Sequence, residues 1–271
     1  KGRTLDQWRR DNLTDIVRYI YKGVKEIKPW VKVSTCPVGK YKDTSRYSSR
    51  GWNAFHTVYQ DPQGWMGEGI QDQIYPMMYF RQNNFYPFVL DWQEQCNGRQ
   101  IIPGLGIYFL HPDEGNWIRE DVDRQINFIR EHKLAGEAHY RAKYLMDNTQ
   151  GIYDELTENF YAHPALQPAM PWLDNVPPSA PSGLKVISGK DGYTSLTWQA
   201  ATDNDKMNAP RYVVYASDVY PVDTTRPENI IAQGIRGTEY IYAPLQPWNR
   251  KVYFAITAVD RYGNEGKAVQ E

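Results

Sequence analysis

The stretch 72-DQIYPMMYF-80 is almost entirely apolar or aromatic, with a proline at its centre and charge only at its first residue. A short apolar run of this kind is typical of a buried strand. Alternation of side chains along a strand places Tyr75, Met77 and Tyr79 on one face. We therefore expect a strand that is buried for most of its length. Its start, Asp72, would be structural, and its far end would carry Tyr79 toward a site.

Helical and strand-like patterns alternate around this stretch. Predicted helices cover residues 13–27, 61–70, 86–95, 118–129 and 149–161, and predicted strands cover 31–37, 73–80, 100–109 and 136–145. Four repeats of helix and strand imply right-handed βαβ units on a parallel sheet. A complete eightfold barrel needs about 250 residues, and this part of the chain is shorter. The sheet is therefore either open or the last four units of a barrel whose first half lies upstream. The missing initial methionine and the abrupt helical start favour the second alternative.

The chain changes character at 174-DNVPPSAPSGLKV-186, where prolines cluster in a short polar run. Proline ends helices and favours extended neighbours, so this run predicts a linker. We place a (β/α)-barrel segment at residues 1–175 and a second domain at 176–271. The second part has short runs of period two, rich in β-branched and aromatic residues, at 183–188, 193–200, 211–218, 239–245 and 251–260. These runs predict a β-sandwich, with Trp198 and Leu196 on the core face of one strand.

The bulk composition excludes some classes of function. A chain of 271 residues, 41% hydrophobic, is enough for one large domain or two ordinary ones. A net charge of -1 and a pI near 6.6 give no electrostatic case for binding nucleic acid or an anionic membrane. No apolar run approaches the roughly 18 residues of a transmembrane helix. No signal peptide is recognisable and residue 1 is lysine, so we expect a processed or truncated chain.

Aromatic residues make up 14% of the sequence, with nine tryptophans and 21 tyrosines. Such rings can stack on sugars, and the alternative explanation is that β-rich proteins commonly have many tyrosines in their strands. The two cysteines, Cys36 and Cys96, form either one bridge or two free thiols. No CxxC motif or histidine cluster suggests a metal site. No GxGxxG, P-loop or GxSxG motif is present, so we expect neither a cofactor nor a serine nucleophile.

Residues 177–271 resemble a fibronectin type III module. The matching features are the entry PPSAPSGLKV, the strands SLTWQAATD and YVVYAS, and the ending YFAITAVDRYGNEG. The resemblance implies a β-sandwich of the kind attached to bacterial glycan-active enzymes. The usual leucine six residues before the strand tyrosine is not kept, because Leu245 and Tyr253 lie farther apart.

Residues 1 to about 175 resemble the C-terminal half of the glycosyl-hydrolase-like family 10. The matching stretches are WRRDNLTDIVRYIYKGVKEIKP, VSTCPVG, VYQDPQGWMGEGIQDQIYPMMYF, IIPGLGIYF and PALQPAMPWLD. The resemblance implies an exported bacterial protein, periplasmic or at the cell surface, that acts on cell-wall or polysaccharide glycans. The family has an aspartate-rich strand of the form DGIHFDDYF ahead of its Trp-Arg-Arg-x-Asn helix, and no such strand precedes Trp8 here. The catalytic carboxylates are therefore expected upstream of this chain.

Glycoside hydrolysis generally needs two carboxyl groups about 5–10 Å apart, which a barrel holds at the C-terminal ends of its strands. The predicted strand ends and the loops beyond them offer other side chains. The candidates for substrate binding are Tyr79, Tyr108, His139, Arg141 and His111. The alternatives are core packing for the tyrosines, a buried polar pair for His139 and Arg141, and a surface position for His111. Asp61 is a weak catalytic candidate, with helix capping as its alternative.

Two functional hypotheses follow. The first is a glycoside hydrolase whose substrate is a carbohydrate, with the β-sandwich as a spacer or sugar-contacting appendage. The alternative is a non-catalytic glycan-binding or cell-surface adhesion protein that kept the barrel and lost its acids. Trp65, Trp92 and Trp117 could stack on sugars, but packing of helices on the sheet is the favoured role. An open half-barrel would also expose an apolar sheet edge, which favours self-association.

Overall fold

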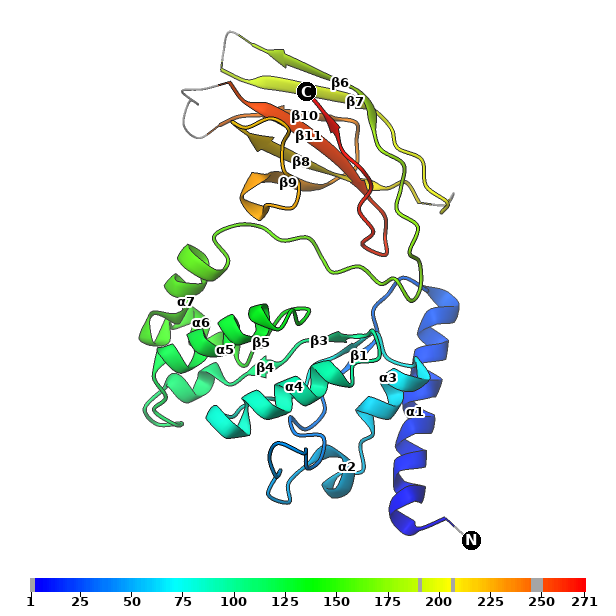
Figure 1. Cartoon of the computed structure of the whole chain (residues 1–271), viewed down its shortest axis with the longest axis vertical. Helices are drawn as coiled ribbons and strands as arrows, with labels where there is room; N and C mark the ends of the chain where they lie inside the picture. The colour runs from blue at the N-terminus through cyan, green and yellow to red at the C-terminus, as the bar shows by residue number, and fades with distance from the viewer. Residues whose placement is uncertain (1–2, 190–191, 206–207, 245–250) are drawn as a thin grey trace. The chain divides into compact units, whose positions relative to one another are not determined.

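The chain forms two compact units, residues 1–159 and 160–271. The computed structural model describes residues 3–189, 192–205, 208–244 and 251–271. Figure 1 shows that the first unit combines helices with short strands, whereas the second is built from strands. The structure thus has the mixed helix and sheet that the sequence predicts for the first part and the antiparallel strands that it predicts for the second.

The elements of the first unit include the predicted helices and strands in the predicted order, with additional short helices between them, and the predicted helix 149–161 is divided into a 3-10 helix, a short α-helix and a π-helical turn. They are α1 (Leu5–Ile27), β1 (Ser34–Thr35), α2 (Ala54–Thr57), α3 (Pro62–Glu68), β2 (Gln73–Ile74), η1 (Gln82–Asn84), α4 (Tyr86–Glu94), β3 (Gln100–Ile101), β4 (Gly104–Leu105), η2 (Ile107–Leu110), α5 (Arg119–Glu131), β5 (Ala138–His139), α6 (Ala142–Met146), η3 (Thr149–Gly151) and α7 (Ile152–Glu155), with a π-helical turn at Leu156–Phe160. Local signals set several boundaries. Asp61 caps α3 and Gly69 ends it in the left-handed conformation at φ 78°, as expected for these residue types.

The strands of the first unit pair in parallel and in chain order. β1 pairs with β2 and β2 with β3 in one sheet, and β4 pairs with β5 in another. Met77 forms parallel bridges to Val38 on one side and to Gly104 on the other, which connects the two short sheets. This pairing confirms the parallel sheet.

All four predicted strands are shorter than the sequence pattern suggested. The predicted strands 31–37 and 73–80 are reduced to β1 and β2, of two residues each. The predicted strand 100–109 leaves the sheet at Gly106, and the 3-10 helix η2 takes its last residues. The predicted strand 136–145 stops at His139, and α6 begins at Ala142. The early end of the predicted strand 136–145 has a local cause, because the sequence AKYLM of α6 is rich in strong helix formers.

In the stretch 72–80, one face is fully buried and the other is half-buried. Ile74 and Met78 are fully buried, whereas Tyr75, Met77 and Tyr79 are half-buried. The alternation therefore follows the predicted period of two through the proline. It places Tyr79 beyond the last bridged residue, at the C-terminal end of this parallel strand.

Asp72 anchors the other end of that strand and has no exposed surface. Its carboxylate accepts hydrogen bonds from the Tyr21 hydroxyl at 3.1 Å and the Val33 backbone N–H at 2.7 Å. It also pairs with the Lys25 ammonium at 2.7 Å. A buried carboxylate needs such partners to offset its desolvation. Asp72 thus ties α1 and the entry to β1 to the start of β2, which is the structural role that the sequence predicts.

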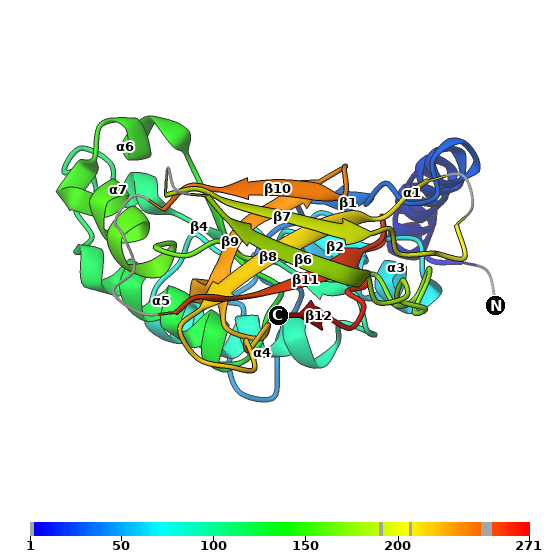
Figure 2. The ribbon, with the colours of Figure 1, turned by 90° about the horizontal axis from the view of Figure 1, so that it is seen from above.

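The second unit is an antiparallel β-sandwich. Its strands are β6 (Ser182–Ser188), β7 (Thr194–Gln199), β8 (Arg211–Ser217), β9 (Ile230–Ile235), β10 (Glu239–Tyr242), β11 (Tyr253–Val259) and β12 (Val269–Gln270), with the 3-10 helix η5 at Pro227–Asn229. One sheet has the order β10-β7-β6 and the other β12-β11-β8-β9. Figure 2 shows the three strands of the first sheet side by side. Leu245, which bears on the departure from the fibronectin pattern, lies outside the described residues.

The sandwich core is formed by both sheets. Leu196 and Trp198 of β7 are buried against residues of β8 and β11, and the Trp198 ring lies 5.3 Å from the Tyr212 ring. This arrangement confirms the predicted core face. The sequence did not predict β9 and β12, which lie at the two edges of the four-stranded sheet. β9 pairs with β8 through an irregular register, and irregular edge strands carry a weak period-two signal.

The division between the two units falls at 159/160, earlier than the predicted boundary at 175/176. Residues 166–174 belong to the second unit and contact the sandwich. The Met170 N–H donates to the Tyr262 carbonyl at 2.8 Å, and the Asn264 side-chain amide donates to the Asp174 carbonyl at 2.9 Å. The proline-rich run follows this segment and leads directly into β6.

Candidate functional site

Three tyrosine rings meet where parallel strands of the first unit end. Tyr79 follows β2, Tyr108 lies in η2 after β4, and Tyr140 follows β5. The Tyr79 and Tyr140 rings stack with centroids 5.2 Å apart, and the Tyr108 ring meets them edge-on at 5.7 and 5.6 Å. We call these three residues the tyrosine cluster. Edge-on and stacked pairs at these distances are favourable aromatic geometries.

Glycines of β4 and its exit make room for the cluster. A Cβ atom at Gly104 would lie 3.3 Å from the Tyr79 ring, and one at Gly106 would lie 3.1 Å from the Tyr79 Cβ. The two glycines therefore accommodate a bulky neighbour, one of the two roles that the sequence suggests for them. The Tyr108 N–H donates to the Tyr140 carbonyl at 3.1 Å, which fixes the spacing of these two residues.

A second aromatic pair, Phe109 and Trp117, packs against Tyr108 of the cluster. The Phe109 ring lies 4.0 Å from the Tyr108 ring and stacks on Trp117 at 4.7 Å. Trp117 is buried, and the Arg81 guanidinium lies 5.1 Å above its ring. Trp65 and Trp92 are also buried, with their indole N–H groups donating to Thr14 and Gly39. All three tryptophans serve packing, as the sequence favoured.

Charged and polar side chains border the cluster beyond β4 and β5. The Arg141 guanidinium is exposed and lies 5.6 Å above the Tyr144 ring. The Tyr144 hydroxyl donates to the Glu114 carboxylate at 3.0 Å. The His111 ring lies 5.9 Å from the same Tyr144 ring. Burial raises the pKa of the Tyr108 phenol, and the nearby Glu114 and Tyr140 raise it further. Arg141, His111 and Glu114 therefore share the same edge of the sheet.

Burial shifts the pKa values of His139 and Tyr79 toward the neutral form of each side chain. Burial lowers the pKa of His139 to about 4, and burial together with the neighbouring Tyr140, Cys36 and Tyr108 raises the pKa of Tyr79 to about 12. Neutral imidazole and phenol groups can each donate and accept hydrogen bonds.

Several sequence candidates lie elsewhere or in other roles. Arg141 is exposed whereas His139 is half-buried, so the two do not form a buried polar pair. The Asp61 carboxylate accepts from the Gly64 N–H at 3.1 Å and the Tyr41 hydroxyl at 2.6 Å, which is a capping role. Cys36 and Cys96 are free thiols. Burial raises the pKa of Cys36, which is also close enough to Tyr75 and Tyr79 to raise the pKa of both phenols.

Sequence reasoning missed Tyr140, Tyr144 and Glu114. The predicted strand 136–145 placed Tyr140 on the opposite face from His139 and Arg141, because alternation was carried through the whole segment. The strand ends at His139, so Tyr140 is free to turn toward Tyr79. The helix-forming composition of AKYLM was the signal that could have shortened the strand.

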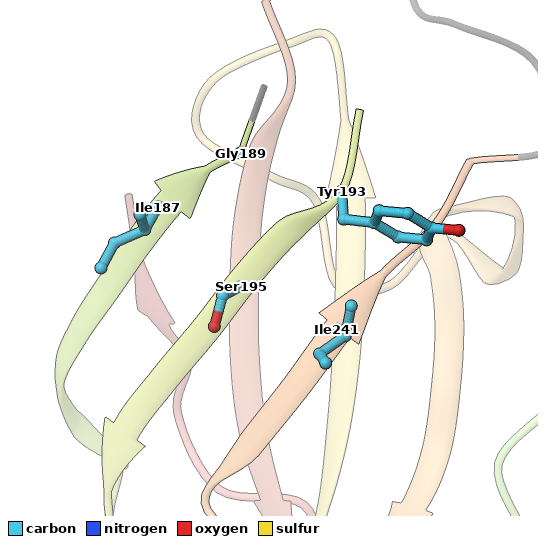
Figure 3. Close-up of a pocket in the computed structure, with 5 residues that line it drawn as sticks. All are labelled: Ile187, Gly189, Tyr193, Ser195 and Ile241. Carbon is cyan, nitrogen blue, oxygen red and sulfur yellow. The ribbon is translucent and has the colours of Figure 1, made fainter. Parts of the chain in front are cut away.

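A depression with a volume of about 430 Å³ lies on the outer face of the three-stranded sheet of the sandwich. Figure 3 shows Ile187 of β6, Ser195 of β7 and Ile241 of β10 in a row across the strands, with Tyr193 beyond them. The strand register pairs Ser195 with both isoleucines. This depression is mainly apolar, in contrast to the mixed lining of the tyrosine cluster.

Two further properties concern metals and membranes. In the described part of the chain, no group of three or more histidine, cysteine, aspartate or glutamate residues is arranged to hold a metal ion. Among the same residues, no helix has the length and apolar character needed to cross a bilayer.

Comparison with known proteins bears on the first unit. Residues 3–109 match the model of the glycosyl hydrolase-like 10 family. That range contains Tyr79, Tyr108 and both glycines of the cluster, and it ends before Tyr140. The match supports a glycoside hydrolase-like protein and leaves the reaction itself to experiment.

Curated relatives carry related names. The chain is 30% identical to glycosyl hydrolase YngK of Bacillus subtilis (strain 168) over 281 residues, which cover 97% of this chain and 54% of YngK. It is also 30% identical to glycosyl hydrolase DigH of Escherichia coli (strain K12) over 77 residues, 27% of this chain and 18% of DigH. The chain thus spans about half the length of YngK.

Among solved structures, the chain is similar to the 6th fibronectin type III domain of human fibronectin type III domain containing protein 3. The identity is 16%, the match covers 36% of this chain and 86% of that one, and the TM-score is 0.26.

Proposed function

We propose that the tyrosine cluster binds a glycan, as part of a glycoside hydrolase-like protein. The observation that carries the proposal is the meeting of three tyrosine rings at the C-terminal ends of parallel strands, the edge at which α/β folds place their ligands. Tyr79, Tyr108 and Tyr140 would offer aromatic surface to sugar rings, and His139 would contribute a neutral polar group. Arg141 and His111 would contact the ligand at the border.

For hydrolysis, the reaction would need two carboxyl groups on either side of the glycosidic bond. Glu114 is a candidate for one of them, because its carboxylate lies beside Tyr144 in the border of the cluster. The other would come from the portion of the complete protein that corresponds to the unmatched part of YngK. We also propose that the first unit is the second half of a barrel and that the sandwich is a fibronectin type III module serving as a spacer.

The test is a hydrolysis assay with the complete product of the gene. Release of reducing ends from peptidoglycan or from plant and host polysaccharides would support the enzyme, and Glu114→Gln should lower that release at least tenfold. The matched control is Glu158→Gln, an exposed glutamate near the C-terminal end of the unit, which should leave the rate unchanged. Hydrolysis that is insensitive to Glu114→Gln would remove this residue from the reaction.

A non-catalytic glycan-binding protein is the second candidate. The uncharged aromatic character of the cluster favours it, because ring stacking serves binding without any chemistry. Glycan binding without release of reducing ends from any polysaccharide tested would favour the non-catalytic glycan-binding protein. Because cell-wall glycans lie outside the cytoplasm, we further propose that the protein is exported, which fractionation of the source cells can test.

A further inference from the structure

The segment that follows β1 carries an excess of positive charge. The charged residues of the range 40–55 are Lys40, Lys42, Arg46 and Arg50, with one acid, Asp43. This segment leaves the C-terminal end of β1 as Tyr79 leaves that of β2, and these ends share one edge of the parallel sheet. The Lys40 ammonium lies 4.7 Å from the ring centre of Phe80, the residue after Tyr79. We call residues 40–55 the basic loop; Figure 1 shows it in blue, leading into α2.

Hydrogen bonds hold the basic loop in one shape. Backbone bonds of 2.8 and 2.9 Å join residues 54–55 to residues 40–41 and close the loop at its base. Within it, the Asn53 amide donates to the Ser49 hydroxyl at 3.1 Å, and that hydroxyl donates to the Asp43 carboxylate at 2.6 Å. Asn53 and Ser49 are buried. The exposed side chains of the loop therefore project from an ordered frame, and its one acid is engaged within it.

The cations of the basic loop differ in their partners. Arg46 forms an ion pair with Glu94 at 2.5 Å and is neutralised by it. Lys40, Lys42 and Arg50 form no ion pair with any residue in the described ranges of the chain. Three positive charges of one loop are therefore left without an acid.

These three cations contact neutral groups instead. The Lys42 ammonium lies over two aromatic rings, 5.2 and 5.6 Å from their centres. The Arg50 guanidinium donates to the Tyr47 hydroxyl at 2.9 Å, and the Lys40 ammonium donates to the Asn84 side-chain oxygen at 2.7 Å. Such contacts satisfy hydrogen bonds but leave the net charge in place.

Two of the charges also repel each other. Lys40 is only 6% exposed; its burial lowers the pKa of its ammonium, and the nearby Arg50 lowers it further. Like charges held close together without an acid between them raise the energy of the free protein, and a bound anion would relieve this repulsion. Lys42 and Arg50 are exposed and can reach such an anion. A guanidinium and a carboxylate form strong paired hydrogen bonds.

Trp52 adds an aromatic surface to the same loop. It lies two residues after Arg50 and is 59% exposed, although tryptophan is a residue that proteins mostly bury. The Thr57 hydroxyl donates to the Gly51 carbonyl at 2.7 Å and holds the turn that precedes Trp52. An indole ring offers a flat apolar face to a sugar ring. The loop thus combines a stacking surface with cations that lack a partner.

We propose that the basic loop binds the carboxylates of an acidic glycan, with Lys42 and Arg50 pairing with carboxylates and Trp52 stacking on a sugar. The inference rests on the proposed function, because the glycan would continue from the tyrosine cluster toward the loop. The carboxylate can lie on the sugar ring, as in uronic acids, or on an ether substituent, as in muramic acid. Nucleic acid is the weaker alternative, since strong binding to it commonly uses about 6–10 phosphate contacts and the loop has three unpaired cations.

Calorimetric titration of the complete gene product tests the proposal. The probes are oligogalacturonate and oligosaccharides of muramic acid and N-acetylglucosamine, each as the free acid and as the uncharged methyl ester. In roughly 20 mM salt, at least one free acid should bind about tenfold or more tightly than its ester. In roughly 500 mM salt this preference should fall below about threefold, because salt screens exposed charges.

Two double variants with the same change of charge locate the preference. Lys42→Gln with Arg50→Gln should bring the affinity for the free acid down to that for the ester. The control is Lys28→Gln with Lys133→Gln, two exposed lysines in the connections that lead into β1 and β5, at the opposite edge of the sheet. It should keep the full preference. All four side chains except Lys42 and Arg50 lie away from the proposed site, and both double variants should melt within about 1 °C of the parent.

A third variant tests the stacking role. Trp52→Ala should weaken binding of acid and ester alike by about tenfold, and Trp52→Phe should keep most of the affinity because a ring remains. Undiminished binding by Trp52→Ala would remove this residue from the site.

The outcomes separate this inference from the proposed function. Equal affinity for acid and ester in low salt, or a preference that survives in Lys42→Gln with Arg50→Gln, would overturn the acidic-glycan site and leave glycan binding by the tyrosine cluster standing. Absence of binding by acid and ester alike would overturn both. Tighter binding of single-stranded DNA than of any acidic glycan, lost in the same double variant, would assign the cations to phosphate and overturn the proposal.

Discussion

Replacing Asp72 by alanine tests how the sheet of the first unit is anchored. The Asp72 carboxylate is fully buried, and it holds the Lys25 ammonium, the Tyr21 hydroxyl and the Val33 N–H. Removing one member of a buried ion pair usually costs about 3–5 kcal/mol. Lys25 keeps two other acceptors, the carbonyls of Pro29 and Val31. We therefore expect a loss near the lower limit, about 3 kcal/mol.

Urea unfolding of the first unit is the assay. Because the chain has two compact units, its unfolding is followed separately for each, and only the transition of the first unit should move to lower urea. The control is Asp15→Asn, which removes an exposed partner of Arg18 and should cost under about 0.5 kcal/mol. A double-mutant cycle with Lys25→Met should give a coupling of at least about 1 kcal/mol. A loss below about 1 kcal/mol for Asp72→Ala would refute this anchoring role.

Three other predictions concern stability. The pKa of His139 is about 4, below its ordinary value of 6.5, so the unfolded chain takes up a proton that the folded chain refuses. The free energy of unfolding should therefore fall by up to about 3 kcal/mol as the pH drops from 6.5 to 4, and a urea titration of His139→Gln should show a smaller fall. Gly106→Ala should lower the free energy of unfolding by about 1–3 kcal/mol, because the new Cβ would lie 3.1 Å from the Tyr79 Cβ. An unchanged free energy of unfolding in urea would mean that Tyr79 moves aside without cost. Gly23→Ala should stabilise the 271-residue chain by about 1 kcal/mol, since a Cβ there meets nothing within 4 Å, and an unchanged melting temperature would count against this.

Local chemistry explains why most helices of the first unit were predictable. The Asp61 side chain caps the start of α3, and Gly69 ends the helix because glycine readily adopts the left-handed conformation. The buried stripe Val122, Ile126 and Ile129 likewise defines the inner face of α5. The strand ends were less predictable, because the exit of the chain into η2 and α6 depends on neighbours distant in sequence.

The candidate site was predictable in part for the same reason. Alternation along β2 correctly placed Tyr79 on the half-buried face, beyond the last bridged residue. Tyr140 was missed because its direction depends on where β5 stops. Glu114 lies in a loop whose position relative to Tyr144 no local pattern reports. In the sandwich, alternation identified β7 and its core residue Trp198, whereas the short edge strand β12 carried too little pattern.

Glycan binding by the tyrosine cluster is the central claim, and calorimetric titration of the 271-residue chain with soluble peptidoglycan fragments and cello- and chito-oligosaccharides tests it most directly. Tyr140 and Tyr153 are equally exposed, at 48% and 49%, but only Tyr140 belongs to the cluster. We predict saturable binding of at least one of these glycans, weakened at least tenfold by Tyr140→Ala and unchanged by Tyr153→Ala. Absence of binding to all of them, or equal affinity in the two variants, would contradict the claim.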